Sequence, residues 1–253
     1  MKWIFCFFTF FSVVSNSVYA QTERINELHF TGLKKTKATF VRKFLETKKG
    51  QLLDSTQIQS DIIRLKRLPS ISNVTYQVIQ LSNNQHSLRF NFEENHTLIP
   101  AFNYWTTINT NAYKLGLYEY SLFGENITFG GFYQYNGQNT YGLNINAPYL
   151  FSNKFGLGVN YLNWKSKEPL YIGDQSANYV YQNTSYELLG TYELNFKNTL
   201  QIGVSLFNEK YNAIEEFTGL DIPSRMDTNK QLVKIIYTYQ NLDYFYFYIS
   251  GFK

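Results

Sequence analysis

The chain has 253 residues, of which 19% are aromatic, including 22 Tyr and 22 Phe, and its formal net charge is +4. Soluble cores rarely contain so much Tyr, whereas membrane barrels place it in girdles at both membrane interfaces. A mean hydropathy of −0.32 excludes a bundle of membrane-spanning helices, and the small, dispersed charge does not indicate a nucleic-acid-binding protein.

The first part of the chain, residues 1–20, has the pattern of a secretory signal peptide. Lys2 is followed by an apolar run from Trp3 to Val14, and Val18-Tyr19-Ala20 forms the expected cleavage site. The alternative is an uncleaved membrane anchor. An apolar run of about twelve residues is too short to cross roughly 30 Å of hydrocarbon, which favours cleavage.

The segment 25–94 predicts a small module with the element order β-α-α-β-β. A short strand at 25–30 ends at Thr31-Gly32. Thr36 is expected to cap a first helix that Gly50 terminates. The apolar stripe of this helix consists of Phe40, Val41, Phe44 and Leu45.

A second helix is expected to begin at Asp54 or Ser55 as its cap and to end before Pro69. Its apolar residues, at helical spacing, are Ile58, Ile62 and Leu65. Two alternating strands then flank a turn at 82–84. Their apolar positions are Val74, Tyr76 and Val78 in the first strand and Leu88, Phe90 and Phe92 in the second.

Several short segments of this module resemble a POTRA domain and occur in the order that such a domain requires. They are INELHFTGL at 25–33, KTK at 35–37, GQLLD at 50–54, LKRLP at 65–69 and VTYQV at 74–78. POTRA domains precede the barrel in the superfamily of BamA, TamA and the two-partner-secretion translocases. The resemblance implies a periplasmic POTRA domain at 21–97, followed at 98–253 by the N-terminal part of an outer-membrane β-barrel.

The resemblance also implies a function for the second strand-forming segment of the chain, which carries Val74, Tyr76 and Val78. POTRA domains hold client polypeptides by pairing an extended chain with an exposed strand edge, which is β-augmentation. Alternatively, the apolar residues of this strand only pack on the two helices, and both roles are compatible because packing uses a face and pairing uses an edge. The expected client-binding residues are Asn73, Val74, Thr75, Tyr76, Gln77 and Val78.

The remainder of the chain alternates apolar with polar residues in segments of roughly ten residues. In the segment 140–149, one side carries Tyr141, Leu143, Ile145, Ala147 and Tyr149, and the other carries Thr140, Gly142, Asn144 and Asn146. Side chains of a strand alternate between two faces, so one face is apolar and the other is polar. An outer-membrane barrel has this pattern, with lipid outside and a wet lumen inside.

The alternation predicts nine strands, at 101–108, 113–121, 126–135, 139–147, 155–164, 179–194, 199–208, 230–240 and 244–252. If the N-terminal module is periplasmic, every second connection should be a short periplasmic turn. The expected turns are 123–125, 148–154, 195–198 and 241–243. The two long polar connections, 165–178 and 209–229, would both lie on the outward side.

An odd strand number conflicts with the even number of bacterial single-chain barrels and would leave edges open in lipid. The superfamily has sixteen-stranded barrels with an Arg-Gly-Phe or Arg-Gly-Tyr loop motif, which this sequence lacks. We therefore expect a truncated barrel that belongs to a longer protein. The alternative is a miscounted strand and a complete eight-stranded barrel.

No catalytic, metal or cofactor site is predicted. The histidines His29, His86 and His96 lack metal-ligand spacing, and the single cysteine, Cys6, lies in the signal segment. The leading hypothesis is outer-membrane protein assembly or polypeptide translocation. The expected partners are unfolded outer-membrane or secreted polypeptides, outer-membrane lipid and periplasmic accessory proteins, but not nucleic acid. The competing hypothesis is a small porin-like or surface-exposed barrel with a periplasmic tether.

Overall fold

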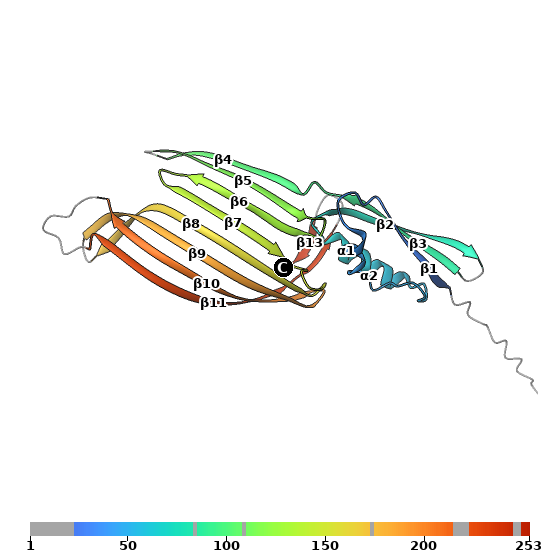
Figure 1. The fold of residues 1–253 in the computed structure, drawn as a ribbon. Helices are drawn as coiled ribbons and strands as arrows, with labels where there is room; N and C mark the ends of the chain where they lie inside the picture. The colour runs from blue at the N-terminus through green and yellow to red at the C-terminus, as the bar shows by residue number, and fades with distance from the viewer. Residues whose placement is uncertain (1–22, 83–84, 108–109, 173–174, 215–222, 245–248) are drawn as a thin grey trace, which may run out of the picture.

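The computed structural model describes residues 23–82, 85–107, 110–172, 175–214, 223–244 and 249–253. These residues form a small α/β module and a large antiparallel sheet, which a short segment at 95–97 connects (Figure 1). The expected signal peptide and the tip of the expected turn at 82–84 lie outside the described residues. In the described part of the chain, no helix is long and apolar enough to cross a membrane.

The N-terminal module has the predicted order of elements. They are β1 (Arg24–Thr31), α1 (Ala38–Arg42), α2 (Ser55–Lys66), β2 (Ile71–Ser82) and β3 (Gln85–Glu94). The strands form one sheet in the order β1-β3-β2, in which β1 runs parallel to β3 and β2 runs antiparallel to it. β3 is therefore the central strand, and β1 and β2 lie at the two edges of the sheet.

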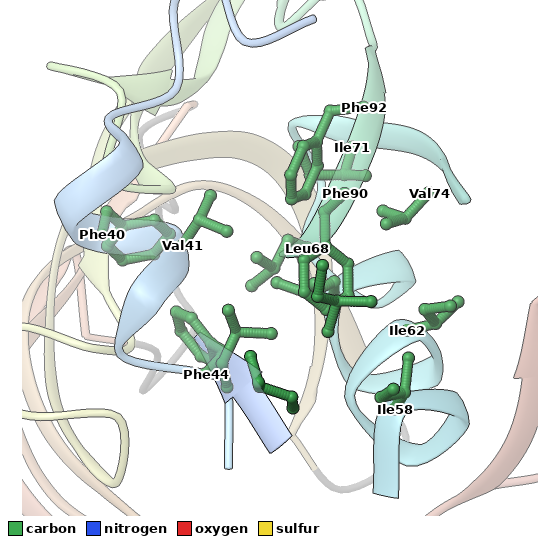
Figure 2. Close-up of a cluster of buried hydrophobic side chains, with 14 residues drawn as sticks. Phe40, Val41, Phe44, Ile58, Ile62, Leu68, Ile71, Val74, Phe90 and Phe92 are labelled. Carbon is green, nitrogen blue, oxygen red and sulfur yellow. The ribbon is translucent and has the colours of Figure 1, made fainter. Parts of the chain in front are cut away.

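The hydrophobic core lies between the sheet and the two helices (Figure 2). All the apolar residues that were predicted for the helices and for β3 are buried, which confirms the predicted periodicities of α2 and β3. They are Phe40, Val41, Phe44, Leu45, Ile58, Ile62, Leu65, Leu88, Phe90 and Phe92. The cap of α2 is also confirmed, because Asp54 accepts hydrogen bonds from the N–H groups of Thr56 (2.8 Å) and Gln57 (3.3 Å).

The first helix is much shorter than predicted, and its caps differ. Lys37 rather than Thr36 is the N-cap residue, and it forms no side-chain cap hydrogen bond. The helix ends at Arg42, well before Gly50. Gly50 instead occupies a turn with φ of +89°, where its N–H donates to the carbonyl of Ile25 at 2.7 Å.

A buried carboxylate explains the early end of α1. Asp61 of α2 is fully buried and accepts hydrogen bonds from the backbone N–H groups of Glu46 and Thr47, both at 2.9 Å. A helix would need these N–H groups for its own carbonyls. Phe44 and Leu45 therefore reach the core from the chain beyond α1 rather than from a continuous helix.

The second unit is a single antiparallel sheet of eight strands. They are β4 (Leu98–Thr107), β5 (Thr110–Leu122), β6 (Ile127–Tyr135), β7 (Asn139–Ala147), β8 (Phe155–Ile172), β9 (Gln175–Asn195), β10 (Asn198–Ala213) and β11 (Arg225–Tyr239). Each strand pairs with its neighbours in sequence, from β4 to β11. The sheet curves like part of a barrel wall, but in the described part of the chain β4 and β11 do not pair, so it is open (Figure 1).

The predicted alternation corresponds to two faces of this sheet. In β7, Tyr141, Leu143 and Ile145 are exposed on the convex, outer face, whereas Thr140 is fully buried on the concave side. The same outer face carries the exposed residues Leu117, Val159, Leu188, Val204 and Ile235. Ala147 departs from the prediction because it is buried at the end of the strand that faces the N-terminal module.

Two predictions about the sheet are wrong. The segment 165–178 is not a long loop, because β8 and β9 pair through most of it, and β10 and β11 likewise extend into 209–229. Pairing uses backbone groups, so polar and charged residues beyond the apolar band remain in strands. The expected ninth strand at 244–252 is instead part of a separate hairpin of β12 (Asn241–Tyr244) and β13 (Ile249–Phe252).

Candidate functional site

The residues predicted to bind clients all lie in β2, which is an edge strand. Residues from Ile71 to Ser82 pair with β3 on one side. On the other side, β2 has no strand neighbour among the described residues. An edge of this kind presents unpaired N–H and C=O groups, to which an extended chain can add as a further strand.

The side chains of β2 divide between the core and solvent. Val74 is buried and Tyr76 packs against the core, as predicted for this face, while Thr75 and Gln77 are exposed. Val78 is 41% exposed, so the alternative in which all three apolar residues of this strand pack on the helices does not hold for Val78. In Figure 1, β2 and β3 project beyond α2. An exposed apolar residue therefore lies on the outer part of the free edge.

Three turns of the large sheet hold the N-terminal module against one end of that sheet. The first is the turn between β5 and β6. The backbone N–H of Lys37 donates to the carbonyl of Gly124 at 3.1 Å, and its ammonium pairs with Glu125 at 2.7 Å. Gly124 has φ of +72°, and a Cβ atom there would lie 2.1 Å from the carbonyl oxygen of Lys35. Glycine is therefore required at this contact.

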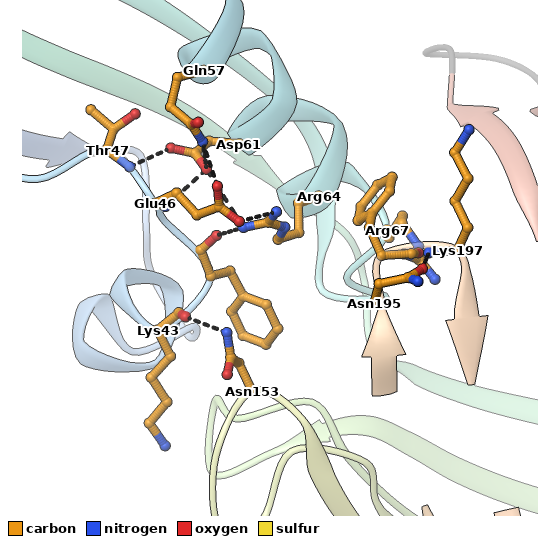
Figure 3. Close-up of polar contacts among 12 residues, drawn as sticks. Lys43, Glu46, Thr47, Gln57, Asp61, Arg64, Arg67, Asn153, Asn195 and Lys197 are labelled. Atoms are coloured by element: carbon orange, nitrogen blue, oxygen red, sulfur yellow. Dashed lines mark hydrogen bonds and ion pairs between the residues drawn. The ribbon is translucent and has the colours of Figure 1, made fainter. Parts of the chain in front are cut away.

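The second contact involves the turn between β7 and β8. Tyr149 lies against the N-terminal core, with its ring centroid 4.7 Å from that of Phe44 and 6.3 Å from that of Phe40. In the same turn, the side-chain amide of Asn153 donates to the carbonyl of Lys43 at 3.1 Å (Figure 3). This turn thus completes the core of the module.

The third contact is the turn between β9 and β10, which meets the C-terminal end of α2. The guanidinium of Arg67 lies 4.5 Å from the ring centroid of Phe196 and donates a hydrogen bond to the backbone carbonyl oxygen of Phe196. The guanidinium of Arg64 lies 5.7 Å from the same ring. Cation–π contacts of this type contribute about 0.5–2 kcal/mol, according to their exposure.

Two carboxylates hold the loops that carry these contacts. Glu46 pairs with Arg64 at 2.6 Å (Figure 3). Hydrogen bonds from Arg64 and then from Gln57 lower the pKa of Glu46. Burial raises the pKa of Glu94, but the backbone N–H groups of Lys35 and Thr36 outweigh it, so that the pKa is lowered overall.

Sequence reasoning identified the three turns but not their contacts with the module. Tyr149 and Phe196 are aromatic residues within two of these short connections, and both rings contact the N-terminal module. The sequence pattern does not distinguish Tyr149 from its neighbours Leu150 and Phe151, which are exposed.

A family model described as "POTRA: Surface antigen variable number repeat" matches residues 23–95. Residues 23–95 form a POTRA domain. The match covers the three-stranded sheet and both helices that were described above. No curated protein matches the sequence.

The fold of this chain is similar to the folds of solved structures. BamA from Haemophilus ducreyi lacking POTRA domains 1–3 has a TM-score of 0.63 at 16% identity, covering 88% of this chain and 45% of that one. CdiB from Escherichia coli has a TM-score of 0.53 at 9% identity, covering 89% and 43%. At such identities the likeness concerns the fold. This chain spans less than half the length of these structures.

The concave face of the large sheet carries a row of polar side chains. Glu187 of β9 is its centre, and accepts hydrogen bonds from Asn160 of β8 (2.8 Å) and Ser205 of β10 (2.7 Å). Lys234 of β11 pairs with the same carboxylate, and Asn144 of β7 donates to Asn160. One row thus connects five adjacent strands.

The described part of the chain contains no cluster of three or more His, Cys, Asp or Glu residues that could hold a metal ion. His29 of the POTRA domain instead contacts Glu27 at 2.9 Å on an exposed surface.

Proposed function

We propose that this chain acts in outer-membrane protein assembly or polypeptide secretion. In this proposal, the POTRA domain at 21–97 lies in the periplasm and takes up unfolded client polypeptides through the free edge of β2. The large sheet, at 98–253, belongs to a barrel wall in the outer membrane. The observation that carries the proposal is the unpaired edge of β2 between Asn73 and Val78.

The mechanism would use backbone hydrogen bonds rather than a cofactor. An extended segment added to β2 satisfies its N–H and C=O groups, which gives affinity with little dependence on sequence. Exposed Val78 would add an apolar contact next to the exposed amide of Gln77. The three turn contacts keep the POTRA domain against one end of the sheet, so that a captured segment stays close to the wall into which it is inserted.

The wall itself supports the second half of the mechanism. Its outer face is apolar and suited to lipid, and both β4 and β11 have an unpaired edge in the described part of the chain. A client strand that pairs with such an edge buries its own apolar face in lipid and satisfies its backbone. Free energy of this kind, about 25 cal/mol per Å² of apolar surface, makes nucleotide hydrolysis unnecessary.

Photo-cross-linking tests capture by β2. The full chain is reconstituted in liposomes with a photoreactive residue at Thr75 or Gln77 and mixed with a urea-denatured outer-membrane barrel protein. Glu93, which is exposed on the paired strand β3, is the control position. We expect cross-links from Thr75 and Gln77 in excess of those from Glu93. Equal yields at all three positions would contradict capture at this edge.

Depletion tests the cellular role. In cells that depend on the full-length protein, its loss should lower the levels of other outer-membrane barrels or of secreted polypeptides. Unchanged levels of both would overturn the proposal and favour the competing hypothesis of a porin-like or surface-exposed barrel.

A further inference from the structure

The POTRA domain has a second open strand edge, on the side of the sheet opposite β2. A groove of 420 Å³ lies there, along the outer side of β1. It is lined by residues of β1, α1 and the segment after α1. They are Glu27, Leu28, His29, Arg42, Leu45, Thr47, Lys48 and Lys49.

The beginning of this edge already pairs with a segment of the same chain. Ile25 donates its N–H to Gln51 at 2.9 Å and accepts a hydrogen bond from the N–H of Gly50 at 2.7 Å. Arg24 and Leu52 form an antiparallel bridge. From Glu27 onward, the described residues provide β1 with no backbone partner on this side. The start of this edge thus already pairs with an extended segment of the same chain. This pairing stops at Glu27, where the groove begins.

The chemistry of the groove favours a particular kind of segment. Leu28 and Leu45 are apolar lining residues, and the basic side chains of Arg42, Lys48 and Lys49 surround them. Among the described residues, none of these three basic side chains takes part in an ion pair. Arg42 instead lies 5.3 Å from the ring centroid of Phe30.

Two further groups complete the lining. The carboxylate of Glu27 is the one acidic group of the groove and contacts His29 at 2.9 Å. Three basic groups against one acidic group leave the groove positive. Thr47 is 3% exposed, and its hydroxyl has no hydrogen-bond partner in the described part of the chain. A buried polar atom without a partner costs free energy, and a ligand in the groove could relieve that cost.

We propose that the edge of β1 is a second strand-accepting site, which binds extended polypeptide segments that contain alternating apolar and acidic residues. The backbone of the segment pairs with β1 beyond Ile25. Its apolar side chains contact Leu28 and Leu45, and its carboxylates reach Arg42, Lys48 and Lys49. This inference rests on the proposed function, because it assumes that the POTRA domain takes up extended chains. It adds to that function a second site, which prefers segments with acidic residues.

The test uses the full chain in detergent micelles and a fluorescein-labelled peptide of four glutamate–valine repeats as the probe. Fluorescence anisotropy gives the Kd. We expect Lys49→Glu to weaken binding about three- to tenfold, since it removes one attractive charge and adds a repulsive one at an exposed site. A lysine–valine peptide should bind more weakly than the glutamate peptide to the unmodified chain.

Lys34→Glu is the matched control, because Lys34 is exposed, lies outside the groove and undergoes the same change of charge. It should change the Kd less than about twofold. Equal effects of Lys34→Glu and Lys49→Glu would overturn the inference and indicate attraction by net charge alone.

A photoreactive residue distinguishes this inference from the proposed function. Placed at His29 on β1, it should cross-link the glutamate–valine peptide. If the peptide cross-links only to Gln77 on β2, the second site is contradicted while capture at β2 stands. If it cross-links to neither position and the denatured client also fails at β2, both proposals are contradicted.

Discussion

The ring of Tyr149, from the turn between β7 and β8, stands edge-on to the ring of Phe44 in the POTRA domain, with an interplanar angle of 83°. Edge-to-face pairs of this kind contribute roughly 0.5–1.5 kcal/mol beyond the area that they bury. One side chain of the barrel sheet is therefore part of the hydrophobic core of the POTRA domain. The two units should not be treated as independent bodies on a flexible linker.

Replacing Tyr149 by Ala should loosen the POTRA domain and its attachment together. We expect a loss of about 1–2 kcal/mol in the free energy of unfolding of the POTRA domain, because the ring contacts with Phe40 and Phe44 disappear. Limited trypsin digestion of the full chain should then cleave faster at Lys35 and Lys37. Tyr149→Phe keeps the ring and should retain most of the stability that Tyr149→Ala loses. Equal digestion rates for the two variants would contradict a role of the ring.

Gly124 provides a second test of the same attachment. Gly124→Ala places a Cβ atom against the carbonyl oxygen of Lys35 at a residue with positive φ, so both a clash and backbone strain oppose it. Gly50→Ala is the control, because Gly50 also has positive φ but has nothing within 4 Å of the added atom. We expect Gly50→Ala to cost about 1 kcal/mol and Gly124→Ala at least twice as much, measured as the loss of protection of Lys37 in hydrogen exchange. Similar losses for the two variants would show that the chain around Gly124 and Lys35 accommodates the added Cβ atom without a clash.

Local patterns predicted much of this fold. Alternation over ten residues identified β7 and its two faces, since a strand has a side-chain period of two. Asp54 is one of the two caps predicted for α2, because a short acceptor before an apolar stripe satisfies free N–H groups. The candidate edge at β2 followed from the resemblance to POTRA domains, and the structure places those residues on an open edge.

Contacts between distant segments could not be predicted in this way. The early end of α1 depends on Asp61, which lies in the next helix and binds the backbone of Glu46 and Thr47. The contacts of Phe196 with α2 join residues separated by more than a hundred positions. The segment 165–178 is rich in charged and polar residues, which predicts a loop, although backbone pairing does not require an apolar face.

The attachment of the loop at 35–36 should depend on pH through Glu94. The N–H groups of Lys35 and Thr36, at 2.9 and 2.8 Å, lower the pKa of this carboxyl below its ordinary 4.5 despite the opposing effect of burial. A carboxyl whose pKa falls on folding stabilises the folded state above its unfolded pKa, and this contribution is lost as the pH falls through the folded pKa. Glu46 acts in the same direction. The free energy of unfolding of the POTRA domain should therefore decline as the pH falls below 4.5, the ordinary pKa of a glutamate carboxyl.

Urea unfolding of the POTRA domain within the detergent-solubilised chain, at about pH 6 and about pH 3, measures this decline. Glu94→Gln should be less stable than the unmodified chain at the higher pH and should lose less stability on acidification. Glu93→Gln is the control, because no hydrogen bond or ion pair is recorded for the Glu93 side chain within the described residues. If Glu94→Gln retains the full decline, the carboxylate of Glu94 is not its source.

The row of polar side chains on the concave face should hold β11 to the rest of the sheet. Glu187→Ala removes the acceptor shared by Asn160, Ser205 and Lys234, and leaves these groups without their partner. Loss of such a partner costs roughly 1–3 kcal/mol. We expect faster hydrogen exchange of the amides of β11 in the detergent-solubilised chain. Asp227→Asn is the control, since it removes exposed ion pairs of the same strand, which are worth about 0–1 kcal/mol. If Asp227→Asn accelerates exchange as much as Glu187→Ala, the row does not secure the strand.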